Sequence, residues 1–340
     1  MQTSDFDYDL PKEFIAQRPA DPRDSSRLLI LHRQTGKIEH HIFHEIIGHL
    51  SPDDVLVLNE TRVIPARLRA RKIPTGGAVE VLLLRQTALQ TWIAIVGGRG
   101  IHPEQKLQIL GGPQAEVLED LGESRRLIRF DEPIYGQLDG IGEMPTPPYI
   151  HTPLQSPNEY QTVFAEIPGS AAAPTAGLHF TPSLLEGIHA KGIQIVKVIL
   201  HIGLDTFAPV TSTNPLQHSI HKEWCQVTPE AASIINQASQ KGGRVIAVGT
   251  TTVRTLETAA RQARNHERVH PFNGDTDLFI LPGHQFRSID AMITNFHLPR
   301  STLLMMVSAF AGRERMLELY QQAMDANYRF YSFGDAMLIL

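Results

Sequence analysis

Two patterns of hydrophobic and polar residues divide the chain. Between residues 65 and 130 the apolar residues come in six strand-length runs separated by Gly, Pro or polar turns, and no window has a helical period. Six closely spaced strands predict a small antiparallel β-barrel. The runs are ARLRARK, AVEVLLLR, TWIAIVG, KLQIL, AEVLEDL and RLIRF.

From about residue 180 the pattern changes to helices and strands in turn, which is typical of a layered α/β domain. Near the N-terminus two short strand-like runs flank one short helical segment. The His-rich run between them predicts a polar strand at the edge of the sheet. The predicted strands are 27–31, 55–59, 193–202, 244–249, 277–281 and 290–296, and the predicted helices are 43–50, 183–192, 230–242, 251–263, 300–312 and 313–324.

The sequence therefore predicts a three-layer α/β/α domain interrupted by a small antiparallel six-stranded β-barrel domain. We place the α/β domain at residues 1–60 and 155–340 and the inserted barrel at 61–154. The Pro- and Gly-rich segment GIGEMPTPPYIHTPLQSP, residues 140–157, cannot be regular structure and predicts the second boundary.

Composition narrows the class of protein. The 340 residues include one cysteine, Cys225, which excludes an internal disulfide and fits a reducing compartment. The N-terminus is acidic, and no apolar run approaches the ~20 residues of a membrane span, so we expect a soluble cytoplasmic protein, with no membrane association. Because the formal net charge is -5, any contact with nucleic acid must be localised.

Two predicted strand-to-helix turns carry candidate binding groups. RVIAVGTTTVRTLE (244–257) places Gly249 and three threonines at a helix start, where open backbone N–H groups suit a carboxylate or phosphate. The alternative is that Thr250 or Thr251 simply caps the helix. TNFHLPRSTLL (294–304) repeats the arrangement, and both turns lie where a ligand binds in open α/β sheets. Neither a GxGxxG nor a P-loop pattern is present.

Histidines and arginines supply further candidates. HSIHKE offers His218, His221 and Glu223 to a metal, but the pattern lacks HExxH, so no metal site is predicted. In the barrel, alternation places Arg67, Arg69 and Arg71 on one side of a strand, as a ladder that could grip phosphates or as an exposed face that tolerates charge. Three more arginines could add to the ladder: Arg125, Arg126 and Arg129.

PTAGLHFT (174–181), TNFHLPRSTL (294–303) and nine further motifs across the whole chain resemble, in order, those of the S-adenosylmethionine:tRNA ribosyltransferase-isomerases of queuosine biosynthesis. PTAGLHFT and TNFHLPRSTL are the most specific of them. The others are FDYDLPKEFIAQRP, VLVLNETRVIPARL, MPTPPYI, YQTVFA, LHIGLDTFAPV, HSIHKE, AVGTTTVRTLE, FILPGHQF and YRFYSFGDAML. The sequence departs from the family pattern at Thr146, Asp205, Thr252 and Phe333, and only Asp205, a carboxylate near His201, puts the pocket's charge in doubt.

The resemblance implies that the ribosyl part of S-adenosylmethionine is transferred and isomerised onto 7-aminomethyl-7-deazaguanine at the wobble position of a tRNA. The products are epoxyqueuosine-tRNA, adenine and methionine, and S-adenosylmethionine is a consumed substrate, so no cofactor is expected. A monomer is also expected. Two other classes stay open: a metal-dependent hydrolase that uses the His cluster, and a non-catalytic RNA-binding protein.

Within this frame AAAPTAGLHFTP, residues 171–182, predicts a substrate floor, because Ala and Gly let large planar groups approach the backbone. Its alternative is a tight loop buried between domains. The chemistry needs one base and one acid. The catalytic candidates are His179, His201, His221, Glu223 and His297; the tRNA-binding candidates are Arg67, Arg69 and Arg71; the substrate-binding candidates are Pro174, Thr175, Ala176, Gly177, Leu178, Phe180, Gly203, Thr206, Phe207, Thr250, Thr251, Arg254, Asn295, Arg300 and Ser301.

Overall fold

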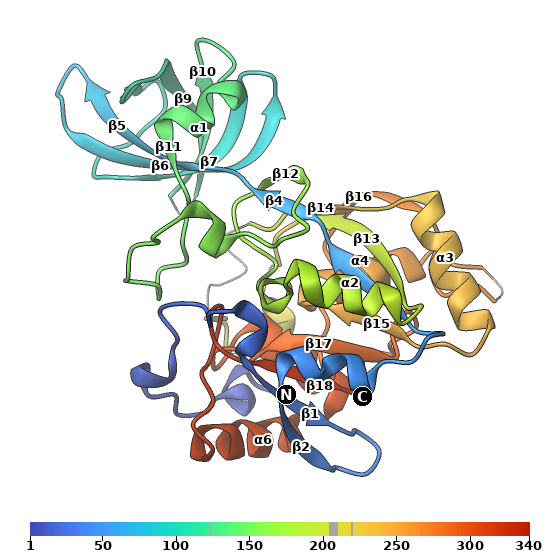
Figure 1. The fold of residues 1–340 in the computed structure, drawn as a ribbon. Coiled ribbons are helices and arrows are strands. Elements are labelled where there is room, and N and C mark those ends of the chain that lie inside the picture. Colours follow the sequence, from blue (N-terminus) through green and yellow to red (C-terminus); the bar gives the residue numbers. More distant parts are fainter. Residues whose placement is uncertain (123, 204–209, 219, 265) are drawn as a thin grey trace.

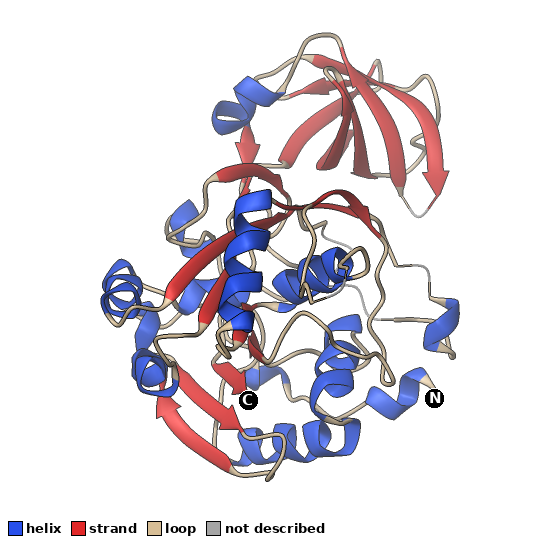
Figure 2. Ribbon diagram, turned by 90° about the vertical axis from the view of Figure 1, so that its right-hand side faces the viewer, coloured by secondary structure: helices blue, strands red, loops and turns tan. Residues whose placement is uncertain are grey.

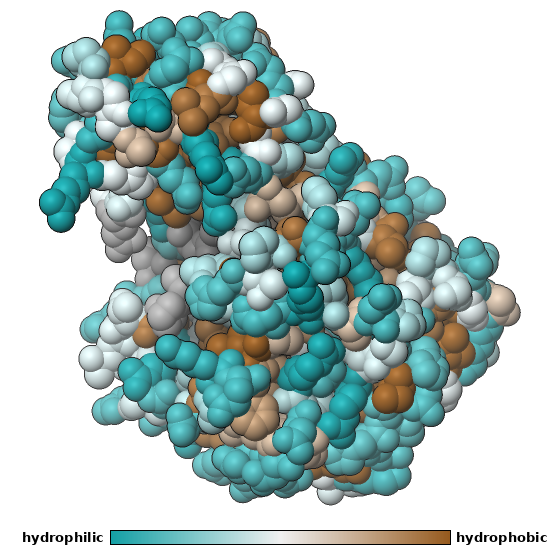
Figure 3. Space-filling model, turned by 60° about the vertical axis from the view of Figure 1, so that its left-hand side comes forward, coloured by the Kyte–Doolittle hydropathy of each residue, from teal (hydrophilic) through white to brown (hydrophobic). Residues whose placement is uncertain are grey.

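The computed structural model describes the whole chain except residues 123, 204–209, 219 and 265. A small β-barrel lies above a larger α/β body, and both chain termini lie in the body (Figure 1). Figure 3 shows the barrel and the body as two lobes with a mostly hydrophilic surface on that face. In the described part of the chain, no helix is both long and apolar enough to span a bilayer.

The barrel confirms the prediction of six antiparallel strands. In order around the barrel they are β5 (Arg67–Ile73), β6 (Ala78–Ala88), β7 (Thr91–Gly97), β10 (Arg125–Phe130), β9 (Gln114–Gly122) and β8 (Lys106–Ile109). β8 pairs back with β5, which closes the barrel, and a short strand β11 (Gly142–Glu143) pairs with the other end of β5. As alternation predicts, Leu68 and Ala70 point into the barrel core.

The body is built on one mixed sheet, of which nine strands lie among the described residues. Across the sheet they are β16 (Phe272–Thr276), β14 (Glu223–Val227), β13 (Gln194–Leu200), β3 (Val55–Asn59), β15 (Val245–Val248), β17 (Ala291–Asn295), β18 (Ala336–Ile339), β1 (Arg27–Leu31) and β2 (Ile38–Ile42). The four central strands β13, β3, β15 and β17 run parallel to one another. β2 lies at the edge of the sheet and is polar, as predicted.

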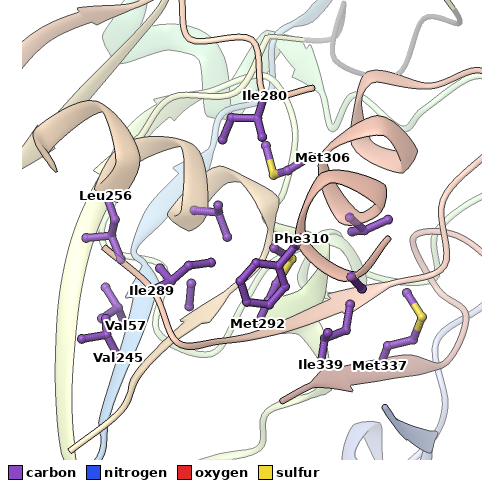
Figure 4. Close-up of a cluster of buried hydrophobic side chains, with 14 of the residues drawn as sticks. Val57, Val245, Leu256, Ile280, Ile289, Met292, Met306, Phe310, Met337 and Ile339 are labelled. Carbon is purple, nitrogen blue, oxygen red and sulfur yellow. The ribbon is translucent and has the colours of Figure 1, made fainter. Parts of the chain in front are cut away.

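Two apolar cores on opposite faces of the sheet make the three layers. Residues of one parity, such as Val57 and Met292, pack against helices α3 (Pro229–Gln240), α4 (Thr250–Ala260), α5 (Thr302–Ala311) and α6 (Arg313–Asp325), and part of this core is drawn in Figure 4. Residues of the other parity, such as Leu56 and Ile293, pack against α2 (Pro182–Ala190) and the 3-10 helices η4 (Phe43–His49) and η7 (Thr175–His179). The two layers of helices are visible on either side of the sheet in Figure 2.

Two predicted elements differ in the structure. Residues 43–49 form a 3-10 helix instead of an α-helix. Residues 277–281 are not a strand, although Leu278 and Ile280 are buried. The alternation here reflects packing alone: the carbonyl of Leu278 accepts a hydrogen bond from Arg254 instead of joining a ladder, and the strand in this region is β16, just before it.

The barrel strands β5 to β10 all fall within the predicted insertion, 61–154, and a two-stranded connection lies at its base. There, β4 (Thr61–Val63), which leads into the barrel, pairs in parallel with β12 (Ile167–Ser170), which follows the barrel in the sequence. The exact domain limits stay a prediction.

Candidate active site

Polar residues follow the carboxyl ends of all four central parallel strands. Thr61 lies two residues after β3, His201 follows β13, Thr250 lies two residues after β15, and His297 lies two residues after β17. Because parallel strands end at the same edge of a sheet, this edge is where an open α/β sheet binds its ligand. The two turns that the sequence singled out therefore lie on one side of the body.

A cavity of about 810 Å³ lies at this edge, between the body and the barrel. Its size is in the usual range for a small-molecule site. The barrel contributes Arg85, Trp92, Arg125 and Tyr135, and the body contributes residues that include Trp224. Of the predicted site residues, those lining the cavity are His201, Gly203, His221, Glu223, Thr250, Thr251 and Arg254.

A void of about 30 Å³ adjoins the cavity, and the two share Thr250, Thr251 and Leu303 among their lining residues. It is lined by Pro174, Thr175 and Ala176 of the predicted floor, together with Asn295 and His297. The Thr175 hydroxyl donates to the Asn295 side-chain oxygen across 2.9 Å. Part of the 171–182 stretch thus reaches the site.

The remainder of that stretch is packed within the protein. A Cβ on Gly177 would lie 2.6 Å from Phe164 Cζ and 2.9 Å from Thr162 Cγ2, so this glycine is required by protein packing. Leu178 and Phe180 belong to two different apolar cores. None of these three lines the cavity or the void, so the alternative of a tight buried loop describes them better than a substrate floor.

Arg254 and Glu223 form a buried ion pair at the cavity wall, with side chains 8% and 7% exposed. The guanidinium also donates to the carbonyls of Leu278, His221 and Thr276, at 2.9, 2.9 and 3.2 Å. The Glu223 carboxylate accepts from the backbone N–H of Gly203 at 2.9 Å. Most donors of Arg254 are therefore engaged by the protein, and the residue ties α4 to β14 and to the segment after β16.

The helix starts differ in how they are capped. The N-cap of α4 is Gly249, with a φ of 88° and no side-chain cap, so the alternative that Thr250 or Thr251 caps this helix is wrong. Gly occupies the position because a positive φ strains other residues. α5 is capped by Ser301, whose hydroxyl accepts from the N–H of Leu304 at 3.1 Å. The uncapped N–H groups of α4 are the ones open to a ligand.

Arg300 is engaged outside the cavity and the void. Its guanidinium pairs with Asp7, and its backbone N–H donates to the carbonyl of Phe6 at 2.9 Å. It lines neither the cavity nor the void and instead ties the N-terminal segment to the turn before α5. The prediction of a substrate contact at Arg300 and at Ser301 therefore has no support in the geometry, because both side chains are used within the protein.

Two of the candidate histidines are deeply buried. His179 stacks on Phe43, its Nδ1 lies 2.7 Å from the Ser26 hydroxyl, and its Nε2 accepts from the Asn295 amide at 3.0 Å. Burial lowers the pKa of His179 to about 3 and that of His297 to about 3. His297 lines the void. His179 lines neither the cavity nor the void, and it is connected to the void by its hydrogen bond with Asn295.

The other two histidines line the cavity. His201 stacks on Trp224, with ring centroids 5.1 Å apart, and its Nδ1 lies 2.8 Å from the Thr61 hydroxyl. Burial lowers the pKa of His201 to about 4. His221 Nε2 accepts from Arg125 of the barrel at 2.6 Å. This bond joins the two lobes across the cavity.

The sequence did not identify the barrel side of the cavity. Arg85 forms a second bridge between the lobes, with its Nη1 3.2 Å from a carboxylate oxygen of Asp275. Tyr135 stacks on Trp92, with ring centroids 6.3 Å apart. One signal in the sequence could have identified this wall of the cavity: aromatic residues and arginines occur close together in the segment predicted to form the barrel. The sequence does not show which barrel strands face the body, because that depends on how the two lobes pack together.

The predicted arginine ladder lies outside the cavity. Arg69 pairs with Glu143 at 2.7 Å, and Arg67 lies 3.6 Å from Glu80 and donates to the carbonyl of Thr146 at 3.3 Å. Arg71 donates to the carbonyl of Gly76 at 3.3 Å. Two of the three guanidiniums thus have carboxylate neighbours, which reduces the charge that they present to phosphates.

Other predicted residues give no geometry. Asp205, Thr206 and Phe207 lie outside the described residues. Within the described ranges, no group of three or more His, Cys, Asp or Glu side chains is placed to hold a metal ion. Cys225 is free and buried.

Comparisons with known proteins agree with this architecture. The family described as "Queuosine biosynthesis protein" matches residues 3–339. The chain is 51% identical to S-adenosylmethionine:tRNA ribosyltransferase-isomerase of Moorella thermoacetica and 50% identical to that of Desulforamulus reducens, over 100% of each chain. The crystal structure of S-adenosylmethionine tRNA ribosyltransferase from Thermotoga maritima is 40% identical, with a TM-score of 0.58 over 99% of this chain and 100% of that one. On this whole-length similarity, the chain belongs to the queuosine biosynthesis protein family.

Proposed function

We propose that the protein is a transferase that moves the ribosyl part of S-adenosylmethionine onto 7-aminomethyl-7-deazaguanine at the tRNA wobble position and isomerises it. The products are epoxyqueuosine-tRNA, adenine and methionine. The whole-length relatives carry the name of this activity. S-adenosylmethionine is consumed in the reaction, and the proposal requires no further cofactor.

One observation carries the proposal: the cavity of about 810 Å³ is lined by both lobes and opens over the ends of four parallel strands. A reaction that joins a small molecule to a base on a large RNA needs a site that encloses the small molecule on one side and is open to the RNA on the other. The uncapped start of α4 suits the methionine carboxylate, because its N–H groups and helix dipole favour an anion.

The charge of the cavity favours a polyanionic partner although the chain is acidic. Among the described residues, four basic side chains line it, Arg85, Arg125, Lys222 and Arg254, against the two carboxylates of Glu223 and Asp275. The formal net charge of the whole chain is -5. The local excess of positive charge supports tRNA binding at the mouth of the cavity, where a flipped-out anticodon base can stack on aromatic side chains.

The chemistry requires a base near the ribose C5 and a donor near the departing adenine. The sulfonium acidifies the C5 protons, and adenine leaves more easily when a ring nitrogen receives a hydrogen bond or proton. His201 and His221 line the cavity and are the candidates for these two roles. His179 lines neither the cavity nor the void, and His179 and His297 act on the site by positioning Asn295 and Thr294. Alignment of the two substrates contributes more than either proton transfer.

We also propose that the protein works in the cytoplasm, where tRNA and S-adenosylmethionine are present, and that a single chain suffices. The second proposal rests on a cavity whose described lining comes from one chain. Size-exclusion chromatography with light scattering tests it.

The direct experiment incubates the protein with S-adenosylmethionine and tRNA that carries the aminomethyl-deazaguanine, followed by mass spectrometry of the digested nucleosides. We expect epoxyqueuosine together with free adenine. An RNA-binding protein without catalysis would give no new nucleoside and no thermal protection by S-adenosylmethionine. A metal-dependent hydrolase would lose its activity in chelator, whereas the proposed transfer should not.

A further inference from the structure

The ring of His201 is held in one orientation by three neighbours. Nδ1 lies 2.8 Å from the hydroxyl oxygen of Thr61, and the ring stacks on Trp224 with an interplanar angle of 25°. Gly169 lies against the ring so closely that a Cβ there would be 2.7 Å from Nε2 and 2.8 Å from Cε1. The ring cannot turn over without displacing one of these groups, so its two nitrogens keep distinct surroundings.

Thr61 decides which nitrogen carries the proton. This residue is completely buried, and the only hydrogen-bond partner of its hydroxyl among the described residues is Nδ1 of His201. If Nδ1 were protonated, the hydroxyl could only accept, and its own hydrogen would be a buried donor without an acceptor. The favourable arrangement therefore has the hydroxyl donating to an unprotonated Nδ1, with the ring proton on Nε2.

The opposite nitrogen has no hydrogen-bond partner within the described part of the chain. His201 lines the cavity together with Gly169, which packs against Nε2, so, as far as the described residues go, an acceptor for Nε2 can come only from a ligand in the cavity. Burial lowers the pKa of His201 to about 4, so the ring is neutral near pH 7. A neutral imidazole with its proton on Nε2 is a hydrogen-bond donor at that atom and cannot accept a proton there.

We infer that Thr61 is a positioning residue that holds His201 as the Nε2–H tautomer, and that His201 donates a hydrogen bond to an acceptor nitrogen of the purine in the cavity. This inference rests on the proposed function, since the purine is the adenine that departs from S-adenosylmethionine. Negative charge develops on the adenine ring as its bond to ribose breaks, and a fixed donor stabilises it without transferring a proton. His201 is thereby excluded as the base.

The tautomer is measured directly by long-range ¹H–¹⁵N correlation spectra of the ring nitrogens, with the His201 signals identified by their loss in His201→Gln. We expect Nε2 protonated and Nδ1 unprotonated at pH 7 in the protein without ligand. In Thr61→Val, which removes the hydroxyl at nearly the same volume, we expect a mixture of tautomers, and Thr61→Ser should restore the single one. Protonated Nδ1 in the parent protein, or a Thr61→Val spectrum identical to the parent, would overturn the inference.

Turnover separates a donor from a base. A Gln side chain can donate from a position near Nε2 but cannot act as a base. His201→Gln should therefore lose about tenfold or less in kcat, and His201→Ala about 10² to 10³, the range for one lost donor. Thr61→Val should lower kcat more than it raises KM for S-adenosylmethionine, with rescue in Thr61→Ser. Equal losses in His201→Gln and His201→Ala would overturn the donor role.

Binding of the product gives a readout that does not depend on turnover. Adenine added to the parent protein should shift the Nε2–H resonance of His201 and leave the Nδ1–H resonance of His179, whose two nitrogens are both bonded within the protein, in place. An Nε2–H that does not respond to saturating adenine would refute the contact. A parent protein with the expected tautomer but no epoxyqueuosine product would instead contradict the proposed function.

Discussion

Replacing Arg254 by alanine distinguishes a structural role from a substrate contact. The sequence placed Arg254 in a turn that binds the methionine carboxylate, which predicts about 1.5 to 3 kcal/mol weaker binding of S-adenosylmethionine on its loss. In the structure the guanidinium is instead bonded to Glu223 and three backbone carbonyls. Its removal leaves the Glu223 carboxylate buried without its cation.

The loss of stability in Arg254→Ala follows from the unpaired carboxylate of Glu223. Breaking a buried pair by removing one partner costs about 3 to 5 kcal/mol. With an unfolding entropy of about 2.1 cal/mol/K per residue over 340 residues, Tm falls by roughly 4 to 7 °C in Arg254→Ala. The double variant Arg254→Met with Glu223→Gln should lose much less, because it buries no charge and Gln can still accept from the N–H of Gly203.

The assay is differential scanning calorimetry paired with isothermal titration of S-adenosylmethionine. Arg261→Ala is the matched control: it lies at the end of the same helix, is 57% exposed and should change the free energy of unfolding by less than about 0.5 kcal/mol. An Arg254→Ala protein with the Tm of the parent and at least tenfold weaker binding would refute the structural role and restore the sequence prediction.

Three further outcomes are expected. Burial lowers the pKa of His179 to about 3 against about 6.5 in the unfolded chain, so the unfolded state binds more protons between these values and stability falls as the pH falls. In urea titrations between pH 7 and 5, His179→Gln should remove about 2 kcal/mol of this decline in total. Arg85→Glu should lower the slope of log K for tRNA against log salt by about 0.7 to 0.9 if the RNA lies on the cavity side, whereas an effect confined to Arg69→Glu would place it on the ladder. Gly177→Ala should cost about 1 to 3 kcal/mol of stability, because its Cβ would press on Phe164, and an unchanged urea midpoint would contradict that.

The strand edges and the barrel were predictable because each depends on local pattern. Alternation with period 2 and turn residues identified all six barrel strands, and the alternation of strands and helices placed the turns after β15 and β17 at strand ends. The same reasoning failed at 277–281, where buried Leu278 and Ile280 alternate without a ladder. Periodicity reports burial, and burial does not require a strand.

The contacts of the site could not be predicted because their partners are distant in sequence. Arg254 meets Glu223 across 31 positions, and Arg125 meets His221 across 96. The sequence showed which residues could ionise but not which charges neutralise one another. It likewise could not show that His179 lies behind Asn295, since that depends on how η7 packs against η4 and the end of β17.

The pairing of β1 with β18 affects how the protein can fold during synthesis. β1 comprises residues 27–31 and its neighbour β18 comprises residues 336–339, so this part of the sheet can form only after about 300 further residues have been translated. The barrel strands span residues 67–130 and can close while the ribosome is still making the body. Until residues 336–339 have been made, Leu28 to Leu31 have no partner on that side of the sheet, and this nascent edge is exposed to chaperones or to pairing with another chain.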